Sequence, residues 1–242
     1  MVWFLVAGFT GLFLAHTAPF PFLLESFAPS KSLWRMPRDN GVSPTVYLTF
    51  DDGPNPRVTP ALLDVLRDTG ARATFFLIDA HVTDATAPIV RRMFDEGHGV
   101  GLHSDTRGLM IKTPDDLAAL LVRNAERIER LTGHRPCRLF RPHAGWRSGS
   151  MYEALMRIDH RLVGWTWGLW DWNWYRPPEA EGLAQRLIRR VSAGDILVMH
   201  DGHHLNPEAD RRYAIEATRM LVPALDARGY QFDALCDALP AS

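Results

Sequence analysis

The chain has 242 residues, of which 46% are hydrophobic and 23% charged, a composition that fits one α/β domain with a sizeable core. The formal net charge of −1 gives no electrostatic footprint for nucleic acid, so we expect no nucleic-acid partner. Two cysteines, Cys137 and Cys236, are neither a disulfide framework nor a zinc-binding pattern. They could pair, but we expect two free thiols.

The first 24 residues are mostly apolar and are predicted to be a signal or membrane-anchor segment. We therefore expect an exported or membrane-anchored protein, with a cytoplasmic one as the alternative. No Lys or Arg precedes the apolar run, and Pro19 and Pro21 interrupt any single helix, so an apolar arm packed on the domain is the other interpretation. Residues 25–43 are predicted to be a linker, and residues 44–242 the folded domain.

From residue 45 onward, strand and helix patterns alternate, which predicts parallel β/α units. Thr59 and Thr113, each followed by proline, are the expected N-caps of two helices. Strands are expected at 46–50, 73–78, 99–102, 138–141, 162–166, 195–200 and 230–232. Helices are expected at 60–69, 87–96, 114–132, 149–158, 179–191 and 210–228. About seven repeats in a single domain are therefore predicted.

Two adjacent carboxylates, Asp51 and Asp52, directly follow the first strand of this domain. Gly53 and Pro54 then turn the chain, so both acids are expected at the C-terminal tip of the strand, where barrel and open α/β folds carry their chemistry. Paired carboxylates can divide the work: one holds a metal and the other moves a proton. The alternative is that the motif is only a turn.

Five segments occur in an order that resembles the polysaccharide deacetylase family, the NodB-homology carbohydrate esterases. They are TFDDGP at 49–54, HS at 103–104, FRP at 140–142, DW at 171–172 and ILVMHD at 196–201. The resemblance covers about residues 45 to 235. It implies a distorted (β/α) barrel of about seven strands in which residues 44–242 are the catalytic domain. It also implies a hydrolase that removes N-acetyl groups from an amino-sugar polymer or glycoconjugate with a divalent metal, zinc by expectation.

The resemblance also implies roles for the residues at the strand tips. Asp51 would be the general base and Asp52 a metal ligand. His103 would be the second ligand through a neutral imidazole, and Arg141 would pair with Asp51. Each histidine could instead be a buried structural residue, and the arginine an ordinary ion-pair partner.

One departure from the family pattern affects the metal site. The family places a second histidine ligand four residues after the first, and here that position is Arg107, which cannot ligate. Two substitutes are available: His143, where proline is usual, and Asp105 in the loop of His103. We favour His143, although it could instead contact substrate or solvent. Arg107 could recognise an anionic group of the substrate.

A second departure affects the acid that protonates the leaving amine, the role implied for His200. The family's orienting acid falls on Gly168, so His200 takes its partner from Asp171 or Asp201, or has none. The backbone N–H of Ala144 falls where the family stabilises the oxyanion.

The aromatic residues between 165 and 175 could line a carbohydrate groove or pack the core. Asp171 and Trp172 are the expected substrate contacts there, and His203 and His204 add polar groups to the same face, where a second metal site is the less favoured interpretation. The partner expected is a carbohydrate. The alternative functions are hydrolysis of another amide or ester by the same fold, and sugar binding without catalysis.

Overall fold

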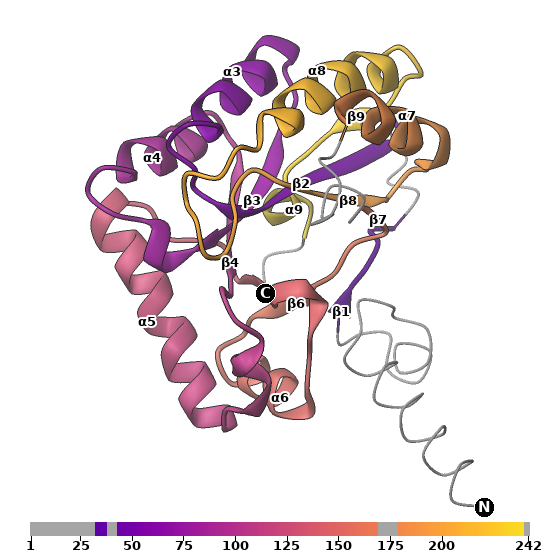
Figure 1. Ribbon diagram of the computed structural model, residues 1–242. Coiled ribbons are helices and arrows are strands. Elements are labelled where there is room, and N and C mark those ends of the chain that lie inside the picture. The colour runs from indigo at the N-terminus through magenta and orange to yellow at the C-terminus, as the bar shows by residue number, and fades with distance from the viewer. Residues whose placement is uncertain (1–31, 38–42, 169–178, 240–242) are drawn as a thin grey trace, which may run out of the picture.

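A curved parallel sheet with helices on its outer side forms the domain (Figure 1). The computed structural model describes residues 32–37, 43–168 and 179–239. In this part of the chain the strand order is β1-β6-β5-β4-β3-β2-β8-β7, with β9 paired to the start of β2, and every pairing between these strands is parallel. The predicted distorted (β/α) barrel in a single domain is confirmed.

The strands are β1 (Ser32–Leu33), β2 (Thr45–Gly53), β3 (Ala73–Ile78), β4 (Gly99–His103), β5 (Leu139–Arg141), β6 (Arg161–Val163), β7 (Trp167–Gly168), β8 (Ile196–His200) and β9 (Gln231–Phe232). The helices are α3 (Thr59–Thr69), α4 (Ala87–Asp95), α5 (Pro114–Thr132), α6 (Gly149–Arg157), α7 (Ala180–Arg190), α8 (Arg212–Asp226) and α9 (Leu235–Ala238). Three short 3₁₀ turns are η1 (Asp79–His81), η2 (Arg107–Ile111) and η3 (His143–Gly145).

The central strands β2, β3, β4 and β8 are buried on both faces, which their runs of apolar residues require. Phe50 and Phe75 stack in the core between the sheet and the helices, with their ring centres 5.2 Å apart. Because parallel strands bring their C-terminal ends to one edge, polar residues at those ends meet there. The register places Asp51 beside His200, and His103 beside Arg141.

Helix boundaries follow the sequence signals with one correction. The Thr113 hydroxyl caps α5 by accepting from the Asp116 N–H, and Gly133 ends the helix at φ +81°. Thr59, however, is not the N-cap of α3, because the helix starts one residue earlier than expected and includes it. The Thr59 hydroxyl instead accepts from the Asn55 N–H and donates to the buried carboxylate of Asp201.

Two further expectations differ from the structure. Cys137 and Cys236 form a disulfide that ties α9 to the segment before β5, so the expectation of free thiols is wrong. Part of the segment expected to be a linker belongs to the sheet, since β1 pairs with β6 and Arg35 forms an ion pair with Asp195.

The predicted signal or anchor segment, residues 1–24, lies outside the described residues. Within the described residues, no helix is long and apolar enough to cross a membrane.

Candidate active site

A tight turn at the end of β2 presents the two carboxylates. Asp52 has a left-handed backbone, φ +70°, an unfavourable conformation for a residue with a side chain and one that is typical of functional sites. The His81 ring holds the Asp52 carbonyl at 3.1 Å. Gly202, just past β8, packs so closely that a Cβ there would overlap this carbonyl, so only glycine fits. The packing on both sides fixes where Asp51 and Asp52 lie.

Arg141, at the end of β5, holds Asp51 through a buried ion pair. Its Nη1 lies 2.6 Å from Asp51 Oδ1 and 2.7 Å from the Thr49 hydroxyl, and its Nη2 donates to the Gly164 carbonyl at 2.8 Å. The guanidinium is fully buried and lies 4.1 Å above the Phe76 ring. This set of contacts orients Asp51 and balances its buried charge.

Asp52, His103 and His143 form the group of potential metal ligands in the described part of the chain. One ligand atom from each lies within 4.8 Å of the others, and all three residues are buried. His103 Nε2 is 3.3 Å from Asp52 Oδ1, yet this carboxylate oxygen has no hydrogen-bond partner among the described residues. Since buried polar atoms are rarely left unsatisfied, the cluster fits a bound cation.

Electrostatics keep both kinds of ligand in the state that a metal needs. Burial alone would raise the pKa of Asp52, but the neighbouring His103, with His200 and His143, holds it well below its ordinary value. Burial lowers the pKa of His143 to about 4, and the charge of His103 adds to this. Asp52 is therefore a carboxylate and His143 a neutral imidazole at neutral pH.

Of the two candidates for the missing ligand, the structure brings only His143 to the cluster. Its backbone N–H donates to the Ser104 hydroxyl at 2.8 Å, which draws the turn after β5 toward His103. Asp105 is exposed and does not belong to the cluster. Ala144, the proposed oxyanion donor, follows His143 with a left-handed backbone at φ +53°.

Arg107 does not occupy a ligand position in space. It is exposed at the start of η2, and its guanidinium lies 5.3 Å above the Trp146 ring. His200 is buried at the end of β8, in register with Asp51.

Gly168 has φ +146°, and a Cβ there would overlap the backbone oxygen of Val198. A residue with a side chain therefore does not fit at this position unless β8 moves.

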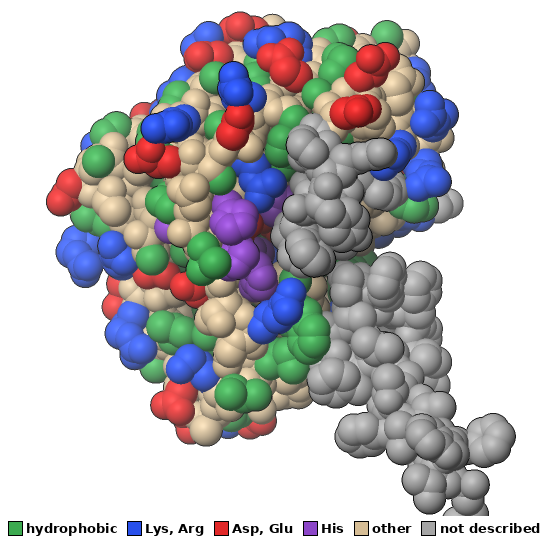
Figure 2. Space-filling view, in the orientation of Figure 1, with side chains coloured by type: hydrophobic (Ala, Val, Ile, Leu, Met, Phe, Trp, Pro, Cys, Tyr) green, Lys and Arg blue, Asp and Glu red, His purple; other side chains and the backbone are tan. Residues whose placement is uncertain are grey.

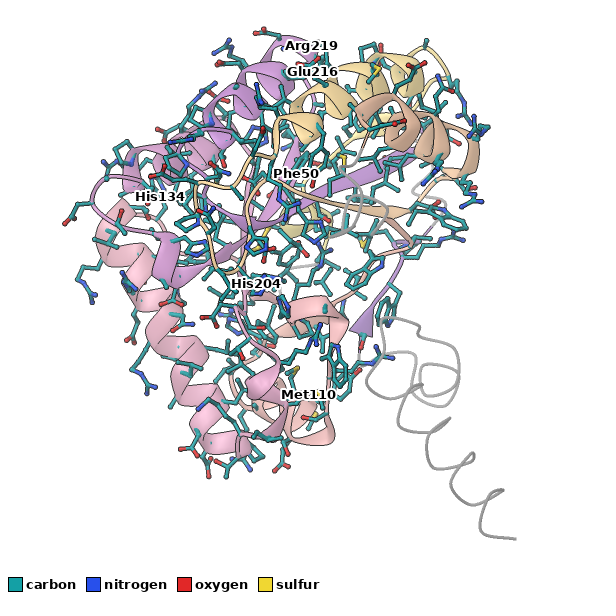
Figure 3. The ribbon with its side chains drawn as sticks, viewed as in Figure 1. Phe50, Met110, His134, His204, Glu216 and Arg219 are labelled. Carbon is teal, nitrogen blue, oxygen red and sulfur yellow. A yellow bond between two sulfur atoms is a disulfide. The ribbon has the colours of Figure 1, made fainter. Side chains whose placement is uncertain are left out.

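His204 and Asp201 lie closer to the candidate ligands and to the Asp51–Asp52 turn than the sequence indicated. The His204 ring lies 4.5 Å from the His143 ring and the same distance from that of His203. Histidine side chains consequently gather in the middle of one face (Figure 2), and His204 lies near the centre of the view in Figure 3. Asp201 lies under the turn, where a Cβ on Gly53 would come within 2.8 Å of its carboxylate; burial raises the pKa of Asp201 to about 7.

The expected substrate contacts Asp171 and Trp172 lie outside the described residues. Two tryptophans of the same aromatic run are described, and both serve packing. Trp165 is buried, with its ring 5.9 Å from that of Trp34. Trp167 is partly buried against the hydrophobic core, and its indole N–H donates to Asp195 at 2.9 Å. For these two rings the packing interpretation holds.

Known proteins are similar to this chain in both sequence and architecture. The family model for polysaccharide deacetylase matches residues 38–163. A chitooligosaccharide deacetylase of Sinorhizobium fredii is 33% identical over 209 residues, covering 81% of this chain and 92% of the relative.

Two solved structures have a similar fold and are also similar to this chain in sequence. Bacillus subtilis PdaA, a family 4 carbohydrate esterase, matches with a TM-score of 0.74 and 26% identity over 89% of this chain and 88% of its own. A family 4 acetyl xylan esterase of Clostridium thermocellum, solved with a cobalt ion, matches with a TM-score of 0.70 and 31% identity over 80% and 89%. The chain belongs to the polysaccharide deacetylase family and is a hydrolase that acts on carbon–nitrogen bonds in amides.

Proposed function

We propose that this protein is a divalent-metal-dependent hydrolase that removes N-acetyl groups from an amino-sugar polymer or glycoconjugate. The observation that carries the proposal is the cluster of Asp52, His103 and His143, with ligand atoms within 4.8 Å, beside the buried Asp51–Arg141 pair. The relatives support the substrate class, because the matched curated proteins include chitooligosaccharide and peptidoglycan deacetylases.

Asp52, His103 and His143 would hold the cation, and two imidazoles with one carboxylate suit zinc. A cation bound there would polarise the acetamido carbonyl and lower the pKa of a nearby water.

The chain's own residues supply the remaining chemistry. Asp51, held by Arg141, takes the proton from the attacking water. The Ala144 N–H donates a hydrogen bond to the oxygen on which negative charge develops. His200, in register with Asp51 at the neighbouring strand tip, gives a proton to the leaving sugar amine. Base and acid thus approach the amide carbon from adjacent strands.

Acetate release from chitooligosaccharides and from peptidoglycan tests this proposal. The metal-free protein should be inactive and should regain activity with zinc. Asp51→Asn should retain its zinc but lose roughly a hundredfold or more in turnover, as the loss of a general base does. Asp95→Asn, an exposed acid at the end of α4, is the matched control and should turn over like the wild type. Full turnover by Asp51→Asn would remove this residue from the mechanism.

Hydrolysis of an O-acetyl ester is the second candidate. It is favoured by the 31% identity to the acetyl xylan esterase. Parallel assays on acetylated xylan separate the two, since an amide hydrolase should release acetate faster from the amino-sugar substrates.

We also propose export of the protein out of the cytoplasm. The disulfide between Cys137 and Cys236 supports it, because disulfides persist in oxidising compartments, and the apolar first 24 residues supply a targeting segment. Cell fractionation tests this directly. Full-length protein recovered only from the cytosol, with an intact N-terminus and two free thiols, would contradict it.

A further inference from the structure

Arg107 lies beside the histidine cluster, and its guanidinium has no hydrogen-bond or ion-pair partner among the described residues. Arg107 lies four residues after His103, and its guanidinium rests 5.3 Å above the face of Trp146. A guanidinium over an indole is attracted by the ring's negative face, which limits where the side chain points. Among the described residues none forms an ion pair with Arg107, including the exposed Asp105 two positions earlier.

The described carboxylates of the site do not balance the positive charge of Arg107. Arg141 already compensates Asp51, and Asp52 is the single carboxylate of the cluster. A divalent cation held there by one carboxylate and two neutral imidazoles would keep a net positive charge, and Arg107 adds a further one. Arg107 lies over Trp146, which is three residues after the candidate ligand His143, so its charge lies beside the site. Basic side chains also border the histidine cluster in Figure 2. The opening therefore favours an anionic ligand.

We propose that Arg107 binds a carboxylate carried by the N-acetylated sugar itself, so that the preferred substrate is an acidic amino sugar. This inference rests on the proposed deacetylase function and narrows its substrate. The planar guanidinium offers paired N–H donors that match the two oxygens of a carboxylate, which lysine cannot reproduce. At this position the chain would have exchanged a family metal ligand for a residue that selects substrate, with His143 taking over the ligand role.

The test compares two ligands that differ only in charge: a disaccharide containing N-acetylmuramic acid, and the same disaccharide with its carboxylate converted to the amide. Binding is measured by calorimetry on the zinc-loaded Asp51→Asn protein, which turns over slowly. Arg107→Gln should weaken binding of the acid about tenfold relative to the amide, the loss of one charged hydrogen-bonding pair. Arg107→Lys should give an intermediate ratio.

Arg228→Gln is the control, because the Arg228 guanidinium also lies over an aromatic ring, 5.2 Å from the centre of the Tyr230 ring, but in the turn after α8. It should leave the ratio between acid and amide at the wild-type value. An unchanged ratio in Arg107→Gln, or equal weakening of both ligands, overturns the proposal. Acetate release by the wild type from the same two ligands is followed separately. If neither releases acetate, the deacetylase function fails while the binding ratio still reports on Arg107.

Discussion

Removing Arg141 while leaving Asp51 should destabilise the domain far more than removing an exposed arginine. Arg141→Met keeps most of the side-chain volume but removes the donors to Asp51, Thr49 and the Gly164 carbonyl. Asp51, only 3% exposed, would then be a buried carboxylate without a counter-charge. Breaking one side of a buried ion pair costs about 3–5 kcal/mol.

Urea unfolding of four proteins measures whether that cost comes from the pair: the wild type, Arg141→Met, Asp51→Asn and the double variant. In the Asp51→Asn background no negative charge is left unpaired, so Arg141→Met should cost at least about 1.5 kcal/mol less than it does in the wild type. Arg135→Met removes an exposed ion pair with Glu129, at 3.0 Å, and should change stability little. If Arg141→Met costs the same in both backgrounds, the two side chains act independently and the reasoning is refuted.

Three further predictions concern the scaffold. Gly168→Ala should lower stability by roughly 3 kcal/mol or more, because its Cβ would overlap β8 at a φ of +146°; wild-type stability in urea would contradict this. Replacing Cys137 and Cys236 by alanine should lower the free energy of unfolding by up to about 4.7 kcal/mol, because their disulfide links residues that are 99 positions apart. Thiol titration of the unfolded wild type should find no free thiol. Burial lowers the pKa of His98 to about 4. As the pH falls below 6.5, His98 therefore binds a proton in the unfolded chain but not in the folded one. His98 alone should therefore contribute a loss of about 2 kcal/mol of stability between pH 7.5 and pH 5, so the stability of His98→Gln, but not that of the half-exposed control His134→Gln, should differ from the wild type in its pH dependence by about this amount.

Residues at strand tips were predictable because their positions follow from a local pattern. The apolar run before Asp51 identifies a buried strand, and parallel strands end at one edge, so β/α alternation predicts that Asp51 and His200 lie at the same edge. The pairing of β2 with β8, which places them side by side, came from the structure. His143 was favoured as the substitute ligand only because imidazole completes the expected ligand set. Its approach to His103 depends on the Ser104 hydroxyl, a contact across 39 residues that no sequence pattern reveals.

The features that sequence reasoning missed depend on packing between distant segments. The disulfide forms because α9 docks beside β4, which brings Cys236 to Cys137 across 99 residues. Thr59 carried a good capping signal, but the buried Asp201 carboxylate takes its hydroxyl instead. Strand β1 has only two residues, too few to show any periodicity, so its pairing with β6 could not be distinguished from a linker.

The affinity for zinc, measured by competition with a chromophoric chelator, tests the central claim most directly. Because Asp52, His103 and His143 form the cluster, His143→Ala and His103→Ala should weaken zinc binding to a similar extent, by tenfold or more as a rough expectation for a lost ligand. Asp105→Ala should bind zinc like the wild type, since Asp105 is exposed and lies outside the cluster. Wild-type affinity in His143→Ala, or no zinc binding by the wild type, would contradict the metal-dependent mechanism.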